Sequence, residues 1–136
     1  MSVPTKMISL QPLLKVQKKF EQFRAHLHTE QEQAGAIQAF EYCFELSWKM
    51  MQRIIASKAV DTPPGKKDIF RAAARLGLLE NPEVWFSFLE QRNMTAHTYD
   101  EEVAEDLLAI LPVFSIELAL FIQKAEACLA QETLYP

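Results

Sequence analysis

The sequence predicts an all-α protein, an antiparallel bundle of about five helices joined by mostly short connections. Three observations lead to this fold class. Only 3 glycines occur in 136 residues, and strand-like alternation of apolar and polar side chains is scarce. Apolar residues instead recur at intervals of three and four, which is the period of an amphipathic helix. Proline, glycine and short polar clusters separate these segments, as expected for connectors.

The first helix is predicted within residues 8–27. Pro12 suits the first turn of a helix better than its middle, so the helix should begin near Leu10 or Gln11. Lysines occupy the outer side. The apolar face consists of residues at alternating steps of three and four, namely Leu13, Val16, Phe20, Phe23 and Leu27.

The second helix, predicted over residues 33–58, is the longest. Its main apolar face contains Ile37, Phe40, Phe44, Met51 and Ile55. Further side chains widen this face well beyond a stripe, namely Tyr42, Cys43, Leu46, Trp48 and Met50. A helix that is apolar on most sides lies at the centre of a bundle or is covered by a second subunit, and we expect both here. Tyr42 and Trp48 therefore indicate core or dimer interface before they indicate platforms for stacked bases.

A connector at residues 61–65 contains paired prolines and a glycine, which cannot continue a helix. A short helix is predicted over residues 66–76, closed by Gly77. Lys67, Arg71 and Arg75 follow one another at steps of four and so lie along one side of this helix. They form either a solvated face or a track for a phosphate backbone.

Two more helices complete the predicted bundle. Asn81 and Pro82 have the residue types of an N-cap and a first helical position, so the fourth helix begins there. Pro112 lies inside the apolar pattern of the last helix, where it removes a backbone donor and predicts a kink.

Composition limits the class of protein. Apolar residues make up 49% of the chain and charged residues 24%, as in ordinary globular domains, and the length predicts a single domain over residues 1–136. The net charge of −4 argues against a general nucleic-acid coat protein but allows a local basic site. No apolar run is long enough for a membrane span. The first six residues lack a secretory pattern, so we expect a cytoplasmic location.

The chain offers no strong metal-binding pattern. Cys43 and Cys128 are the only cysteines, and neither has a neighbouring cysteine at CxxC spacing. Two buried free thiols are favoured over a disulfide between them. The acidic residues from Asp100 to Asp106 suit the positive end of a helix dipole better than a divalent cation. We therefore predict neither a metal nor a cofactor.

One polar stretch, residues 91–100, lies between the last two apolar helices. Arg92, His97 and Tyr99 offer a fixed cation, an imidazole that can exchange a proton near neutral pH, and a phenol. On one unbroken helix Arg92 and His97 would lie roughly 140° apart. A helix end between them, with a new N-cap at Thr98 or Asp100, would let both face a common phosphate-handling pocket.

The motif Arg92-Asn93-x3-His97-x-Tyr99 resembles the Arg-x4-His-x-Tyr signature of HEPN domains that pair with minimal nucleotidyltransferases. The stretches at residues 40–49 and 70–79 fit the same pattern, and so do residues 97–102. The chain is similar over about residues 10–128 to the branch called the nucleotidyltransferase substrate-binding protein family.

This resemblance implies a HEPN-like bundle that forms a homodimer, with two copies of the polar corner at one cleft. It also implies a partner, a minimal nucleotidyltransferase encoded nearby, and RNA or a nucleotide as ligand. Two functions come with the family. One is a metal-independent endoribonuclease toxin with Arg92 and His97 as catalytic residues, silenced when the partner transfers AMP to Tyr99. The other is a non-catalytic subunit that binds substrate for the nucleotidyltransferase.

The proposed site residues follow from the motif and from the short third helix. In the catalytic account Arg92 stabilises the charge that builds on the phosphate and His97 takes or gives a proton. Tyr99 contacts the phosphate or positions His97. Substrate contacts are assigned to Asn93, Tyr99, Arg71 and Arg75. Asn93 has a simpler alternative role, which is to hold the corner through backbone hydrogen bonds.

Overall fold

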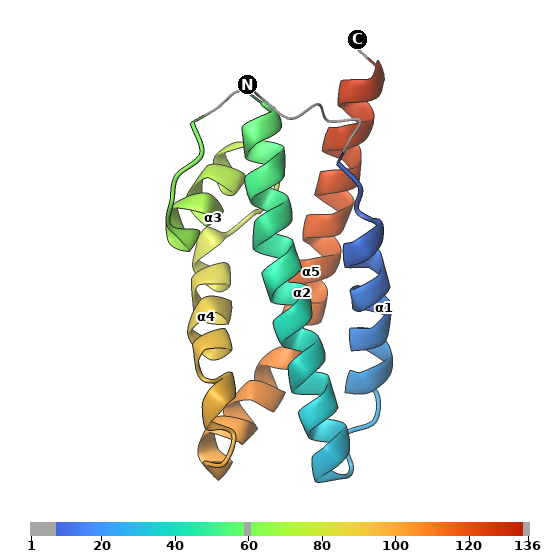
Figure 1. The fold of residues 1–136 in the computed structure, drawn as a ribbon, viewed down its shortest axis with the longest axis vertical. Coiled ribbons are helices and arrows are strands. Elements are labelled where there is room, and N and C mark those ends of the chain that lie inside the picture. The colour runs from blue at the N-terminus through green and yellow to red at the C-terminus, as the bar shows by residue number, and fades with distance from the viewer. Residues whose placement is uncertain (1–7, 59–60, 135–136) are drawn as a thin grey trace.

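The computed structural model describes residues 8–58 and 61–134, and within them it contains α-helices and no strand (Figure 1). The predicted all-α bundle is confirmed. The amino-terminal pattern that suggested a cytoplasmic location lies outside the described residues. In chain order the elements are α1 (Gln11–Arg24), α2 (Glu30–Ser57), α3 (Lys66–Arg75), α4 (Pro82–Asn93), the short 3-10 helix η2 (Thr95–His97) and α5 (Glu101–Leu134).

Local sequence signals explain most of the helix ends. The α1 helix begins at Gln11 with Pro12 in its first turn, as predicted, but it ends at Arg24, before the predicted end at residue 27. The α2 helix begins earlier than predicted because Thr29 and Glu32 form a capping box. Glu32 donates its backbone N–H to Thr29 Oγ1 at 3.0 Å, and Thr29 donates its backbone N–H to Glu32 Oε1 at 2.9 Å.

Aromatic rings from four helices meet in the centre of the bundle. The Phe114 ring of α5 lies with its centroid 5.5 Å from Phe20 of α1, 4.8 Å from Phe40 of α2 and 5.0 Å from Phe88 of α4. All three contacts are edge-to-face, an arrangement that aromatic pairs favour. The α2 helix is therefore central, as its wide apolar surface predicted. Tyr42 is not part of the core, because its side chain is exposed, so of its two predicted places only the dimer interface remains a prediction.

The two cysteines differ in their surroundings. Both are free thiols, but only Cys43 is buried, whereas Cys128 is partly exposed. The prediction of two buried thiols is thus wrong for Cys128, which lies near the end of α5, where fewer helices surround it. Burial raises the pKa of the Cys43 thiol to about 12, with a smaller contribution from the charge of Glu21.

The α5 helix runs unbroken from Glu101 to Leu134 with Pro112 inside it. Figure 1 shows its orange amino-terminal part inclined to its red remainder, as expected for a helix that contains a proline. This inclination brings the start of α5 beside the end of α4, at the lower end of the molecule. None of the helices in the described ranges has the length and apolar character needed to cross a membrane.

Candidate functional site at the corner between α4 and α5

The polar stretch forms a tight corner between two helices. The α4 helix ends at Asn93, the 3-10 turn η2 spans Thr95–His97, and α5 starts at Glu101. Asp100 is the N-cap of α5, since its Oδ1 accepts hydrogen bonds from the backbone N–H groups of Glu102 at 2.9 Å and Val103 at 3.4 Å. Of the two predicted caps, Asp100 is therefore the one that forms. The helix ends between Arg92 and His97, which is the condition under which both could face a common pocket.

Arg92 reaches from the last turn of α4 to the middle of α2. Its Nε donates to Glu45 Oε1 at 3.1 Å, and its Nη1 lies 3.9 Å from Glu41 Oε2. Nη1 also donates to Thr95 Oγ1 at 3.3 Å, and Thr95 Oγ1 in turn donates to the Arg92 carbonyl at 2.8 Å. The hydrogen bonds of the guanidinium within the described residues use Nε and Nη1. The Nη2 group donates to none of the described residues.

Glu45 connects Arg92 to an aromatic side chain further along α2. Its second carboxylate oxygen, Oε2, accepts a hydrogen bond from Trp48 Nε1 at 2.9 Å. Both oxygens of Glu45 are therefore engaged, one by an indole and the other by a guanidinium. Because Glu45 and Trp48 are one helical turn apart on α2, the carboxylate is held rigidly and can fix the direction in which Arg92 points.

His97 and Tyr99 form a second pair on the outer side of the corner. His97 Nδ1 lies 3.2 Å from Tyr99 Oη, and the two rings meet edge to face with centroids 5.8 Å apart. Both side chains are exposed, and Tyr99 retains 83% of its accessible surface. Neither ring is packed into the core, so both can meet a large ligand such as a nucleic acid or another protein.

The structure brings some of the predicted site residues together and leaves others apart. Arg92, His97 and Tyr99 share the corner, but among the described residues Arg92 pairs with α2 while His97 pairs with Tyr99. Asn93, the last residue of α4, is exposed. Its side chain has no hydrogen bond to the described part of the chain.

Arg71 and Arg75 lie on α3, which Figure 1 shows beside the other end of α4. Arg71 Nη1 is 2.6 Å from Asp68 Oδ1, and its guanidinium lies over the Phe86 ring at 4.9 Å from the centroid. These two arginines therefore belong to a separate part of the surface and cannot contact the same phosphate as His97.

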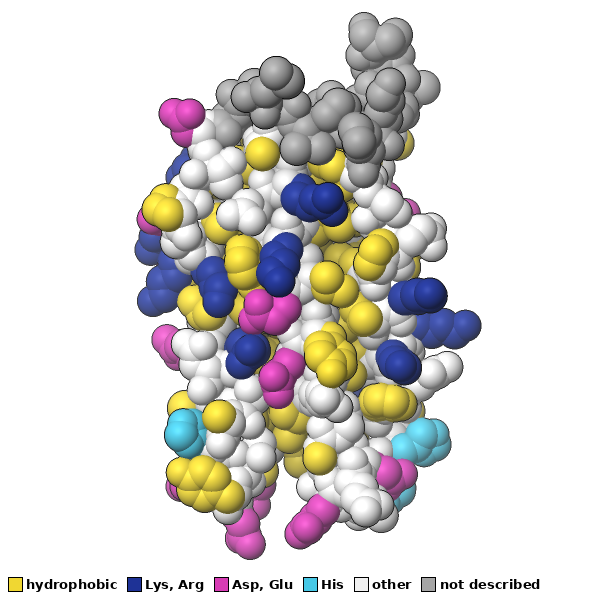
Figure 2. Space-filling model, in the orientation of Figure 1, with side chains coloured by type: hydrophobic (Ala, Val, Ile, Leu, Met, Phe, Trp, Pro, Cys, Tyr) yellow, Lys and Arg dark blue, Asp and Glu magenta, His cyan; other side chains and the backbone are white. Residues whose placement is uncertain are grey.

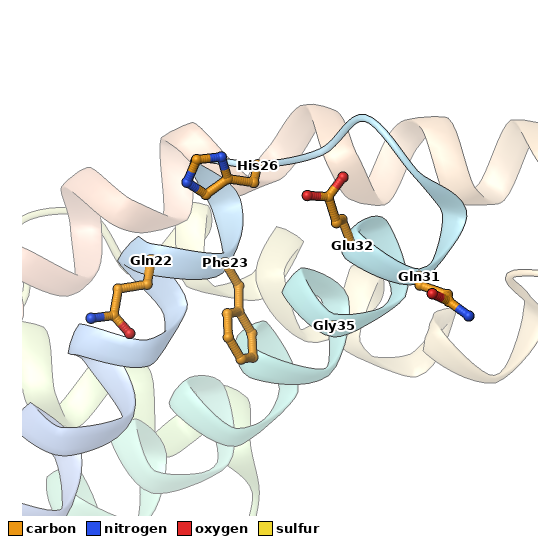
Figure 3. Close-up of a pocket in the computed structure, with 6 residues that line it drawn as sticks. All are labelled: Gln22, Phe23, His26, Gln31, Glu32 and Gly35. Atoms are coloured by element: carbon orange, nitrogen blue, oxygen red, sulfur yellow. The ribbon is translucent and has the colours of Figure 1, made fainter.

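A groove of about 580 Å³ runs beside Tyr99, between the first turns of α2 and α5. The charged side chains that line it, Glu30, Glu101 and Glu105, are all acidic. A smaller pocket of about 350 Å³ lies between the end of α1 and the start of α2. Figure 3 shows Phe23 directed toward Gly35 in this pocket, which includes none of the predicted site residues. Within residues 8–58 and 61–134 no group of three acidic, histidine or cysteine side chains is placed to hold a metal ion.

Comparison with known proteins identifies the family of this chain. The model of a family described as nucleotidyltransferase substrate binding protein like matches residues 9–127. The chain belongs to this family. A solved structure of a Haemophilus influenzae protein, described as the fold of a substrate binding domain of a nucleotidyltransferase, superposes with a TM-score of 0.78 at 33% identity, covering 87% of this chain and 99% of that one. The resemblance drawn from the Arg92 motif is thus confirmed at the level of the family.

Two further relatives of this substrate-binding protein family match. A crystal structure of a Thermus thermophilus protein has a TM-score of 0.76 at 26% identity and covers 83% of this chain and 98% of that one. A Haemophilus influenzae protein named "Probable ribonuclease HepT" is 41% identical over 95 residues, which are 67% of this chain and 65% of that protein. The chain therefore matches just under two thirds of the length of that relative.

The sequence alone did not identify the carboxylates that pair with Arg92. Glu41 and Glu45 lie four residues apart in a helix that is otherwise largely apolar. Charged residues at that spacing share one face of a helix. On a helix in the centre of a bundle, two charges on one face indicate that a polar neighbour lies against them, because unpaired charges are rarely buried. That pattern marked a polar contact on α2, although nothing local to it identified Arg92 as the neighbour.

Proposed function

We propose that this protein is a metal-independent endoribonuclease that acts as the toxin of a pair with a minimal nucleotidyltransferase. The observation that carries the proposal is the corner itself. It presents an imidazole and a phenol 3.2 Å apart on an exposed turn, directly after an arginine whose direction is set by a carboxylate. Family membership supports the nucleotidyltransferase as partner. The name of the relative that is 41% identical supports RNA as the substrate.

The chemistry follows from the side chains present. The ribose 2′-oxygen attacks the adjacent phosphorus, the bond to the 5′-oxygen breaks, and the products are a 2′,3′-cyclic phosphate and a free 5′-hydroxyl. A base removes the 2′-hydroxyl proton, and an acid returns a proton to the leaving 5′-oxygen. His97 can fill either role, which is typically worth about 10²–10⁴-fold in rate. Arg92 Nη2 would stabilise the negative charge on the phosphorane oxygens.

Cleavage needs one group to remove the 2′-hydroxyl proton and another to give a proton to the 5′-oxygen. A homodimer would supply both, because each subunit contributes one His97. A surface on α5 supports such a dimer, because it presents apolar side chains to solvent. Ile116 is 62% exposed and Val113 is 44% exposed, and Pro112 and Ala109 are also exposed on this side. A second copy of the chain that covers this face would remove it from water. The same helix begins at the corner, so the two copies of His97 would be brought toward one cleft.

Tyr99 is the proposed acceptor of AMP: its phenol oxygen, giving up its proton to solvent, would attack the α-phosphorus of ATP held by the nucleotidyltransferase, and pyrophosphate would leave. The phenol of Tyr99 is exposed and contacts only the edge or face of the His97 ring among the aromatic side chains described, so a partner enzyme can reach it. A nucleotide attached to Tyr99 Oη would replace the contact with His97 Nδ1 and place an anion beside Arg92. Substrate would then be blocked by volume and by charge. Both events belong in the cytoplasm, where RNA and ATP are available.

The second candidate function is a subunit that binds substrate for the nucleotidyltransferase without turnover. One finding favours it: the matching family model is described as nucleotidyltransferase substrate binding protein like.

The test is cleavage of single-stranded RNA by the purified protein in the presence of a metal chelator. We expect 2′,3′-cyclic phosphate ends by mass spectrometry, and we expect His97→Ala and Arg92→Ala to abolish their formation. His26→Ala is the matched control, since His26 is likewise exposed but lies just after the end of α1. If the parent protein binds RNA without cutting it, the non-catalytic subunit is the correct function. If His26→Ala is as damaging as His97→Ala, the corner is not the active site.

A further inference from the structure

A second polar surface lies above the corner, where α2, α3 and α4 meet. Four cations on α2 and α3 lie against two half-buried aromatic rings. Lys49 and Lys66 place Nζ 5.8 Å and 5.1 Å from the centroid of the Trp48 ring. On the Phe86 ring of α4, Lys67 Nζ lies 5.6 Å and the Arg71 guanidinium 4.9 Å from the centroid. We call Lys49, Lys66, Lys67 and Arg71, with the rings of Trp48 and Phe86, the basic aromatic face.

The basic aromatic face is continuous with the candidate site. Trp48 carries two of the lysines on its ring and donates its Nε1 hydrogen to Glu45, whose other oxygen receives Arg92. The chain of contacts thus runs from the motif arginine to the cations of α3 without leaving this side of the molecule. In Figure 2 lysine and arginine side chains gather over α3 and the upper part of α2, with acidic side chains below them, in keeping with this arrangement.

The rings restrict the cations. A lysine that is free in water populates many rotamers, and a ligand that orders it must overcome the lost entropy. An ammonium or guanidinium over an aromatic face is already partly ordered. Arg71 is also paired with Asp68 at 2.6 Å, so Lys49, Lys66 and Lys67 supply most of the net positive charge of this face, in a chain whose net charge is −4. The suited ligand is a polyanion with regularly spaced charges.

We propose that the basic aromatic face binds the single strand of RNA that flanks the phosphate held at Arg92 and His97. This inference rests on the proposed ribonuclease function and adds the path of its substrate. Unpaired RNA fits best for two reasons. Attack by the 2′-oxygen needs an in-line arrangement that a regular A-form duplex does not provide. Positively charged surfaces that follow the phosphate backbone are also a usual means of holding single strands.

Charge reversal at two neighbouring lysines tests the path. Lys66→Glu with Lys67→Glu removes one cation from each ring, and both positions lie in the first turn of α3, where glutamate favours the helix. The matched control is Lys18→Glu with Lys19→Glu, which makes the same change in net charge on the exposed side of α1. Both pairs are placed in the His97→Ala protein, so that RNA is bound without being cut.

Binding of a fluorescent single-stranded RNA is measured by anisotropy over a series of salt concentrations. We expect the α3 pair to weaken binding by about tenfold or more and to reduce the slope of log K against log salt by about 1.4, the value for two lost phosphate contacts. The α1 pair should change the affinity by less than about twofold, because it lies off the path. Phe86→Leu should weaken binding by about twofold to fivefold, since it leaves Lys67 and Arg71 without their ring.

Three outcomes overturn the inference. The first is equal loss in the α3 and α1 pairs, which would indicate only a general charge effect. The second is unchanged RNA affinity in the α3 pair together with lost binding of the nucleotidyltransferase, which would assign the face to the protein partner. The third is equal affinity for a duplex of the same sequence. The ribonuclease proposal fails by a different result. RNA that binds on this face but is never cut would contradict the ribonuclease function and would still support the face as the binding site.

Discussion

Arg92 Nε donates to Glu45 Oε1 at 3.1 Å, a pairing between residues 47 positions apart in the sequence. The same carboxylate accepts a hydrogen bond from Trp48 Nε1, so Glu45 joins the motif arginine to the basic aromatic face. Glu41 lies one helical turn earlier at 3.9 Å from Arg92, beyond hydrogen-bonding distance. The two glutamates therefore differ in how strongly they position the guanidinium.

Glu45→Gln and Glu41→Gln remove one charge each from the same face of α2. We expect Glu45→Gln to lower the rate of RNA cleavage by about tenfold to a hundredfold, because a neutral side chain that must also accept from Trp48 aims Arg92 less accurately. Glu41→Gln should change the rate by less than about fivefold, since it removes only a weak, partly exposed pair with a separation of 3.9 Å. The rates are measured with substrate in excess. Equal effects of the two variants, or faster cleavage by Glu45→Gln, would contradict a positioning role.

Ile116→Glu tests the proposed homodimer. The charge would have to be buried against the second copy, so we expect the variant to be a monomer by light scattering while its circular dichroism stays unchanged. Lys124→Glu is a suitable control, because it changes charge on the same helix at a residue that pairs with Glu80 within the protomer. Should Ile116→Glu keep the mass of the parent protein, the exposed side of α5 is not the dimer contact.

Phe114→Ala should be among the most destabilising single changes in this chain. Its ring is fully buried and meets rings from α1, α2 and α4, so its removal leaves a cavity that four helices cannot close. We expect a loss of about 3–5 kcal/mol in the free energy of unfolding. Urea titration followed by circular dichroism measures it. Tyr42→Ala, at an exposed position on α2, should cost less than about 1 kcal/mol, and a similar loss in both variants would argue against the central aromatic cluster.

The two cysteines should react with a thiol reagent at very different rates. Burial raises the pKa of Cys43 to about 12, so at pH 8 it carries almost no thiolate and is also inaccessible. Cys128 is partly exposed and should be labelled first in the native protein. We expect one fast equivalent, lost in Cys128→Ala, and a second that appears only after unfolding. Above pH 9 the unfolded thiol ionises while the folded one does not, so Cys43 reduces stability as pH rises toward 12.

Protonation of Glu32 should reduce the stability of the protein in acid. The hydrogen bond from the Thr29 backbone N–H lowers the pKa of this carboxyl below its ordinary value of 4.5. Its contribution to stability is therefore present above pH 4.5 and is lost as pH falls through the lowered value. Glu32→Gln should show a shallower fall in the urea midpoint over that range. Thr29→Ala should cost about 1 kcal/mol at neutral pH, and an unchanged midpoint would mean that the capping box does not support α2.

Local sequence signals were enough to predict most of the backbone. The period of the apolar residues, the position of Pro12 and the Asn81-Pro82 start each act within one or two helical turns, so they can be recognised without knowing what surrounds them. The start of α2 was missed although its capping box is equally local. The choice between Thr98 and Asp100 as the cap of α5 was left open, because both offer an oxygen at a suitable spacing.

The sequence by itself determined that this chain is a helical bundle with an arginine, a histidine and a tyrosine at one helix end. Only the tertiary structure decided that Arg92 points to Glu45 and that His97 pairs with Tyr99 rather than with Arg92. It also decided that the lysines of α3 lie over aromatic rings of α2 and α4. The physical reason is the separation along the chain of the residues that interact. Periodicity and capping depend on near neighbours in the sequence, whereas the direction of a long cationic side chain depends on which helix packs beside it.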